Sequence, residues 1–111
     1  MELDMAKFEE LKEMSGEDFI GELVDTFLED APKLIAEMKA ALQSGDADAF
    51  RRAAHSLKSN SATFGADHLA ALAKDMEMLG KEHRLPEAEP HLQELEGTLA
   101  AVRGELKGLL A

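Results

Sequence analysis

Residues 55–65 read HSLKSNSATFG and combine a histidine, a lysine and three serines in one short run. An exposed imidazole is largely neutral near neutral pH and can act as a nucleophile. Lys58 follows His55 by three residues, so on a helix its ammonium group lies one turn away and could balance the charge of an anion held there. The chemistry available therefore depends on the direction in which His55 points.

The elements that must position His55 are predicted to be helices. The chain has no Trp, Tyr or Cys, and Ala, Leu, Glu, Lys and Met dominate it. These five are good helix formers, so the composition predicts an all-α fold. A length of 111 residues suits a single compact domain with one core, and we expect one domain over residues 1–111.

Local signals predict where the first helices begin and end. Asp4 can cap a short first helix, and Ser15 followed by Asp18 has the spacing of a capping box for a second helix. An apolar stripe then continues to Leu42 and passes through Pro32. Proline removes an amide and clashes with the preceding turn, so we expect a kink or a break at Pro32.

The clearest boundary in the chain is Ser44-Gly45-Asp46, where Gly45 suits a left-handed position after a helix and Asp46 suits an N-cap. Further helices are predicted over residues 47–64, which Gly65 ends, over residues 67–79, and from Pro86 or Pro90 onward. Four amphipathic segments with short connections predict an antiparallel four-helix bundle with a short additional N-terminal helix.

Helical periodicity predicts that His55 points to solvent. Successive residues are about 100° apart, and His55 falls about 140° from the centre of the apolar stripe. That stripe consists of Ala47, Phe50, Ala54, Leu57, Ser61 and Phe64. The residues around His55 are instead Arg51, Lys58, Ser59 and Ala62.

The surroundings of His55 differ in charge from the rest of the chain. The net charge is −11, so nucleic acid and anionic membranes are poor partners. Yet no acid lies between Asp48 and Asp67, while Arg51, Arg52 and Lys58 are all basic. We therefore expect a local positive patch that would attract an anion.

Other features exclude several classes of protein. Without cysteine there are no disulfides or thiolate sites, which fits a reducing cytoplasm. The sequence contains no run of about 18 apolar residues, which is the length needed to span a membrane. The first residues do not resemble a signal peptide. The four histidines form no i, i+3 or i, i+4 pair and no di-iron motif, so no metal site is expected.

Residues 54–77, AHSLKSNSATFGADHLAALAKDME, closely resemble the signature of histidine-containing phosphotransfer (HPt) domains. That signature is His-x-Leu-Lys-Gly/Ser, then small residues, an apolar residue and Gly, then spaced Leu and Ala before an apolar-Glu pair. The matching positions are His55, Leu57, Lys58, Ser59, Ser61, Ala62, Phe64, Gly65, Leu69, Leu72, Ala73, Met76 and Glu77. Ser59 is a mild departure, because glycine is commonest there. The resemblance covers essentially the whole chain.

The resemblance implies a phosphorelay carrier rather than an enzyme. His55 would accept a phosphoryl group from an aspartyl phosphate on a response-regulator receiver domain and pass it to another receiver, and a hybrid histidine kinase is an expected partner. The family suggests Nε2 as the phosphorylated nitrogen and Lys58 as the residue that stabilises phosphoryl charge. The Mg²⁺ would belong to the receiver, so no cofactor is expected here. We expect a cytoplasmic monomer.

Receiver binding is predicted to involve the surroundings of His55 and the fourth helix. The residues predicted to contact the partner are Arg51, Arg52, Ser59, Ala62, Lys74, Glu77 and Met78. The small side chains at positions 59 and 62 would leave room for the active-site loops of the receiver.

Two other functions remain open. The substrate domain of chemotaxis-type kinases has the same fold and a similar motif, but receives its phosphoryl group from ATP through a separate catalytic domain. A passive helical adaptor would leave His55 merely solvated. A sensor-kinase dimerisation domain is disfavoured, because such domains place an acid directly after the histidine, and here Ser56 follows.

Overall fold

The computed structural model describes residues 1–110, so the domain predicted over residues 1–111 extends one residue beyond the described part. The described residues form helices and no strand, which confirms the all-α class. The elements are α1 (Met5–Ser15), α2 (Glu17–Ser44), α3 (Ala47–Thr63), α4 (Asp67–Lys81) and α5 (Leu92–Leu110), with 3₁₀ turns at Leu85–Glu87 and Glu89–His91.

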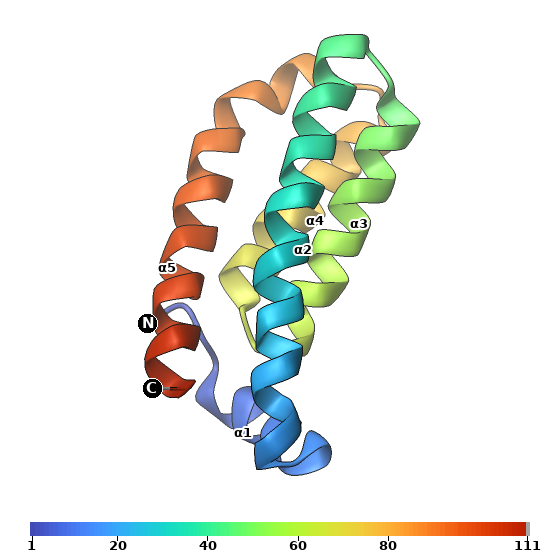
Figure 1. Cartoon of the computed structure of the whole chain (residues 1–111). Helices are drawn as coiled ribbons and strands as arrows, with labels where there is room; N and C mark the ends of the chain where they lie inside the picture. Colours follow the sequence, from blue (N-terminus) through green and yellow to red (C-terminus); the bar gives the residue numbers. More distant parts are fainter. Residues whose placement is uncertain (111) are drawn as a thin grey trace.

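The long helices α2 to α5 lie side by side, and the chain reverses direction at each connection (Figure 1). α1 lies across one end of them, near the end of α3. α3 packs most extensively against α4, and next against α2. The site-bearing helix α3 is therefore held between two neighbours.

The connection between α2 and α3 follows the sequence prediction. Gly45 has φ +73° in the left-handed region, and its N–H and that of Asp46 bond to carbonyls in the last turn of α2. The side chain of Asp46 accepts a hydrogen bond from the backbone N–H of Ala49 and so caps α3.

The predicted capping box at Ser15 is wrong. Ser15 is the last residue of α1, and its hydroxyl donates to the carbonyl of Leu11 at 2.9 Å. Gly16, with φ +91°, precedes α2, which has no side-chain cap. Asp4, by contrast, caps α1 as predicted and accepts hydrogen bonds from the N–H groups of Ala6 and Lys7.

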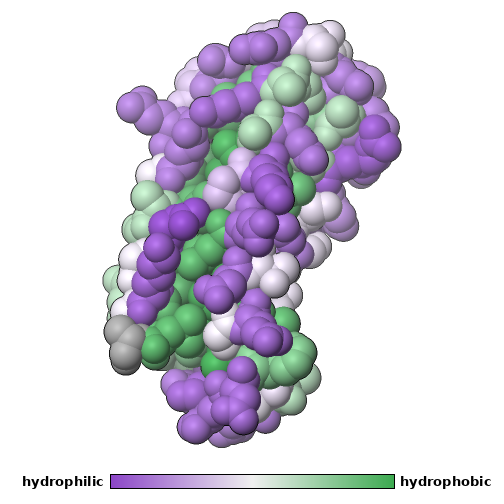
Figure 2. Space-filling view, in the orientation of Figure 1, coloured by the Kyte–Doolittle hydropathy of each residue, from purple (hydrophilic) through white to green (hydrophobic). Residues whose placement is uncertain are grey.

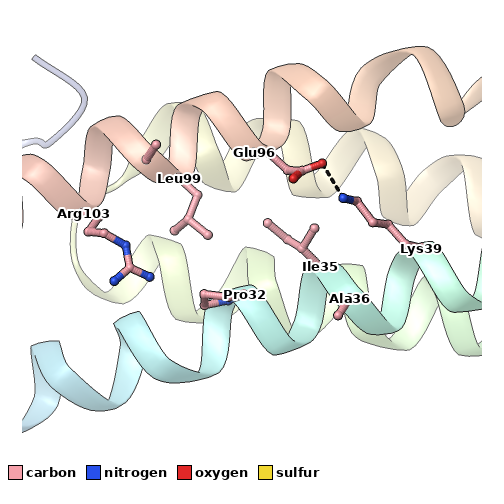
Figure 3. Close-up of a pocket in the computed structure, with 8 residues that line it drawn as sticks. Pro32, Ile35, Ala36, Lys39, Glu96, Leu99 and Arg103 are labelled. Atoms are coloured by element: carbon pink, nitrogen blue, oxygen red, sulfur yellow. Dashed lines mark ion pairs between the residues drawn. The ribbon is translucent and has the colours of Figure 1, made fainter.

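No break occurs at Pro32, because α2 continues from Glu17 to Ser44. Pro32 has no N–H to donate to the carbonyl of Leu28, four residues earlier. The Arg103 guanidinium of α5 donates to that carbonyl at 3.1 Å instead. Figure 3 shows Arg103 reaching from α5 toward the part of α2 that carries Pro32. A neighbouring helix thus supplies a hydrogen bond that the proline removes.

The space between α2 and α5 forms a shallow pocket of about 270 Å³ with Ile35 and Leu99 on its floor. An ion pair of 2.7 Å between Lys39 and Glu96 crosses it (Figure 3). Figure 2 shows the corresponding strip of apolar surface between hydrophilic margins.

The core fills the space between the helices. Val24, Met38, Phe50, Leu95 and Leu106 are among its fully buried residues. The predicted stripe of α3 faces this core: Phe50, Ala54, Leu57, Ser61 and Phe64 are buried and Ala47 is half-buried.

The boundaries of the last two helices differ from the predicted ones. α4 ends at Lys81, two residues later than expected. Pro86 and Pro90 lie in the two 3₁₀ turns, and α5 begins only at Leu92. None of the helices within residues 1–110 combines the length and apolarity that crossing a membrane would require.

Candidate functional site

His55 lies on the outer face of α3, and 55% of its side chain is exposed. This agrees with the direction that helical periodicity predicts. Leu57 and Ala54 on either side are fully buried, so the ring cannot turn inward without displacing the core. α3 therefore presents the imidazole to solvent from a firmly packed backbone.

A carboxylate from the next helix holds the ring of His55. Glu77 on α4 places one carboxylate oxygen 2.6 Å from Nδ1 of His55 and the other 2.7 Å from Nζ of Lys58. Its side chain is only 15% exposed, whereas that of Lys58 is 30% exposed. His55, Lys58 and Glu77 thus form one hydrogen-bonded group, which we call the His55 triad.

Glu77 is ionised at neutral pH. Its partial burial alone would raise the pKa, but the hydrogen bonds from Lys58 and His55, together with their charges, outweigh it and lower the pKa of Glu77 below its ordinary value of 4.5. A carboxylate can only accept, so the Nδ1 of His55 carries the proton in this contact. The lone pair of the neutral ring is then on Nε2, which is not engaged by Glu77.

Sequence reasoning placed Glu77 only among residues that contact a partner and missed its contact with His55. The two residues are 22 positions apart on different helices, and only the packing of α3 against α4 brings them together. The available signal was the glutamate that closes the HPt signature.

The positive patch expected around His55 is partly neutralised. Asp48 pairs with Arg51 at 2.8 Å and with Arg52 at 3.2 Å, and Glu77 pairs with Lys58. The hydrogen bond from Arg51 also lowers the pKa of Asp48. Three cations thus face two carboxylates, so a positive excess remains around His55 that has the expected sign but is smaller than the sequence indicated. The expectation overestimated this charge, because it did not consider the pairing of Asp48 with both arginines and did not include the carboxylate that Glu77 brings from α4.

Four other residues predicted to contact a partner are exposed on α3 and α4, the two helices that carry the His55 triad. Ser59 and Ala62 are exposed on α3, one and two turns beyond His55. Lys74 and Met78 are exposed on α4 on either side of Glu77. Their role in docking stays a prediction.

The described residues 1–110 contain no group of three or more His, Asp or Glu side chains that could hold a metal ion. His68 lies half-exposed, with its Nδ1 3.0 Å from a carboxylate oxygen of Glu2. The arrangement around His55 therefore offers a bare imidazole nitrogen, an ammonium group and a positioning carboxylate.

Comparisons with known proteins agree on one family. The family model of the Hpt domain matches residues 22–105. Among solved structures, the chain is similar to histidine-containing phosphotransfer protein B (HptB) from Pseudomonas aeruginosa PAO1, at 35% sequence identity and a TM-score of 0.93 over 98% of this chain and 94% of that one. No curated protein matches the sequence significantly. The match over most of the chain shows that this protein belongs to the Hpt domain family.

Proposed function

We propose that the chain is a phosphorelay carrier that accepts a phosphoryl group on His55 from a receiver aspartyl phosphate and passes it to the aspartate of another receiver. The observation that carries this proposal is the half-exposed His55 whose Nδ1 is held by Glu77 at 2.6 Å. It leaves Nε2 available as a nucleophile, in a chain that belongs to the Hpt family.

In the proposed transfer, the lone pair of Nε2 attacks the phosphorus atom while the bond between phosphorus and the aspartate oxygen breaks. The aspartate leaves as a carboxylate, and the imidazole becomes positively charged. Glu77 accepts a hydrogen bond from Nδ1–H and stabilises the positive charge of the ring, as the orienting carboxylate does in other histidine sites. Reversal of the step on a second receiver regenerates neutral His55.

Lys58 is proposed to stabilise the phosphoryl oxygens. Its Nζ lies 2.7 Å from Glu77 in the unphosphorylated protein, and the side chain remains partly exposed. Once His55 carries a phosphoryl group, the ammonium can be shared between the carboxylate and the new anion. Arg51 is close by on α3 but is paired with Asp48, so we assign it a smaller role.

The chain itself is proposed to supply no catalytic site beyond the His55 triad, and so to be a carrier rather than an enzyme. The Mg²⁺ that such transfers use would be bound by the receiver. We propose that the four long helices act as one antiparallel bundle spanning the chain as a single domain, that the carrier is a cytoplasmic monomer, and that its partners include a hybrid histidine kinase. The residues proposed to contact the receiver are Arg51, Arg52, Ser59, Ala62, Lys74 and Met78.

A transfer assay tests this function. The chain is mixed with a panel of phosphorylated receiver domains and Mg²⁺, and in parallel with ATP and the catalytic domain of a chemotaxis-type kinase. Rapid labelling from a receiver, which a second receiver then removes, is the expected result. Labelling only from the kinase would indicate the substrate domain of such a kinase, and labelling from neither would indicate a passive adaptor.

A further inference from the structure

Gly80 is buried in α4 at the point where this helix lies against α3. A Cβ atom added there would lie 3.1 Å from Cδ1 of Phe50, 3.2 Å from the carbonyl oxygen of Ala47 and 3.2 Å from Cα of Arg51. Ordinary contacts of a Cβ atom begin at 3.4 Å. Two of these three neighbours are backbone atoms of α3, so only a movement of one helix could make room.

The glycines in the other helices differ from Gly80. A Cβ atom added to Gly21, Gly97, Gly104 or Gly108 would meet no heavy atom within 4 Å outside its own helix turn. Among helical glycines in the described part of the chain, Gly80 alone is in tight contact with another helix. Its lack of a side chain therefore has a packing consequence that the others do not share.

Gly80 lies one turn from Glu77 on the same helix. Its neighbours on α3 are Ala47, Phe50 and Arg51, and Arg51 lies one turn before His55. The contact of Gly80 with α3 and the hydrogen bonds of Glu77 to His55 and Lys58 are thus successive contacts along one helix pair. The distance between α3 and α4 at Gly80 therefore affects the distance from the carboxylate of Glu77 to His55 and Lys58, one turn away.

We propose that Gly80 is a positioning residue for phosphotransfer. Its missing side chain sets the approach of α4 to α3 at which Glu77 contacts His55 and Lys58 together. The expected effect on the phosphotransfer rate rests on the proposed function. The expected effect on the tautomer of His55 does not, because it can be measured without any transfer.

The hydrogen bonds are sensitive to such a separation. At 2.6 Å and 2.7 Å they are at the short end of the range for charge-assisted bonds. A methyl group at position 80 would have to increase the 3.2 Å distances to the backbone atoms of Ala47 and Arg51 to at least 3.4 Å, which requires the helices to move apart. Glu77 would then engage His55 less completely, and the ring would spend more time as the Nε2–H tautomer, whose Nε2 has no free lone pair.

The first test measures the ring directly. Nitrogen-15 NMR of His55 at neutral pH distinguishes the two neutral tautomers in the wild type, in Gly80→Ala and in the matched control Gly97→Ala. We expect mainly the Nδ1–H tautomer in the wild type and the control, and a clear shift toward Nε2–H in Gly80→Ala. Wild-type ring shifts in Gly80→Ala would overturn the proposal, even if that variant were less stable.

The second test measures phosphotransfer from a labelled receiver. Gly80→Ala should be slower by about three- to tenfold, in the lower part of the effect expected when the support of a functional group is displaced. Gly97→Ala should match the wild type. An unchanged rate in Gly80→Ala would contradict the positioning role, whereas absence of transfer in the wild type would contradict the proposed function and leave the NMR result decisive for Gly80.

A second variant covers the case in which Gly80→Ala folds poorly. Phe50→Leu removes the ring atom nearest to position 80, so the double variant F50L/G80A gives the added methyl group more room. The backbone contacts with Ala47 and Arg51 remain, so the double variant should still shift toward the Nε2–H tautomer when it is compared with F50L alone. An unchanged tautomer population in the folded double variant, relative to F50L, would overturn the proposal.

Discussion

Glu77 converts an exposed imidazole into a site with a defined nucleophilic nitrogen. The exposure of His55 could be predicted from the sequence, because the buried partners Ala54 and Leu57 fix the direction of the helix face. The contact with Glu77 could not, since 22 residues separate the two positions and no periodicity reports the distance between helices. The pairing of Asp48 with both Arg51 and Arg52 was missed for a related reason, because a charge count ignores side-chain pairing.

The free energy of unfolding at acid pH should depend on the ionisation of Glu77. Because its folded pKa lies below the ordinary value of 4.5, the carboxylate contributes stability that is complete above that value and is lost as the pH falls through the lower folded pKa. We expect the wild type to exceed Glu77→Gln by about 1 kcal/mol in free energy of unfolding at neutral pH. That difference should shrink as the pH falls below the ordinary pKa of 4.5 and through the lower folded pKa of Glu77.

Urea denaturation at a series of pH values measures this difference. Glu22→Gln, a change of an exposed glutamate on α2, serves as the control for the general loss of a negative charge. A difference between wild type and Glu77→Gln that stays constant into the acid range would show that the carboxylate of Glu77 does not act through its charge.

Lys58→Ala should slow phosphotransfer without unfolding the protein. The side chain is partly exposed and its removal leaves no core cavity. If Lys58 acts as proposed, the phosphoryl oxygens would lose a charge-assisted hydrogen bond in this variant. We expect a decrease of about tenfold in the transfer rate, which corresponds to about 1.4 kcal/mol. Stopped transfer reactions compared with Lys74→Ala, an exposed lysine of α4, provide the measurement, and equal rates for the two variants would exclude Lys58 from the step.

At the scale of elements, local signals predicted most boundaries and tertiary contacts explain the exceptions. Gly45, Asp46 and Asp4 act where their residue types indicate, because turn geometry and capping are local. Ser15 does not cap, since its hydroxyl already bonds within α1. The hydrogen bond that compensates for Pro32 could not be predicted, because its donor, Arg103, lies on α5.

Pro32 and Arg103 should be energetically coupled. In Pro32→Ala the restored N–H can bond to the carbonyl of Leu28, so the hydrogen bond from Arg103 becomes redundant. We therefore expect Arg103→Met to cost about 1 kcal/mol more in the wild type than in the Pro32→Ala background. A double-mutant cycle by urea denaturation measures the coupling.

Lys39→Met gives the matched control for that cycle. Lys39 bridges the same two helices through its pair with Glu96 but does not bond to the backbone near Pro32. Its cost should be the same in both backgrounds. Coupling of Lys39 equal to that of Arg103 would mean that Pro32→Ala shifts α2 as a whole and that no specific hydrogen bond is compensated.

At the scale of the whole molecule, the N-terminal segment joins parts that are distant in sequence. The backbone N–H groups of Glu2 and Leu3 donate to the carboxylate of Glu105 on α5, and that of Asp4 donates to the carbonyl of Gly65 at 2.7 Å. The sequence predicted the helices and their number, but these links join loops and termini without periodic patterns. They close the end of the molecule at which α3 finishes.

Gly65→Ala should destabilise the protein more than Gly45→Ala. Both glycines have positive φ, of +76° and +73°, so either alanine costs about 1–2 kcal/mol of backbone strain. At Gly65, however, the new Cβ would also lie 2.7 Å from the carbonyl oxygen of Asp4, whereas nothing lies within 4 Å at Gly45. We expect an additional cost of about 1–3 kcal/mol. Equal midpoints of thermal unfolding for the two variants would show that the N-terminal segment does not press on Gly65.

The central claim is that His55 carries the phosphoryl group, and mapping the label on the phosphorylated chain tests it most directly. The wild type and His55→Gln are incubated with the same phosphorylated receiver, and the label is located by peptide mass spectrometry after its acid lability has been checked. The account predicts an acid-labile label on the peptide that contains His55 and none on the folded variant. An acid-labile label of equal amount on His55→Gln, placed on His68, His83 or His91, would contradict it.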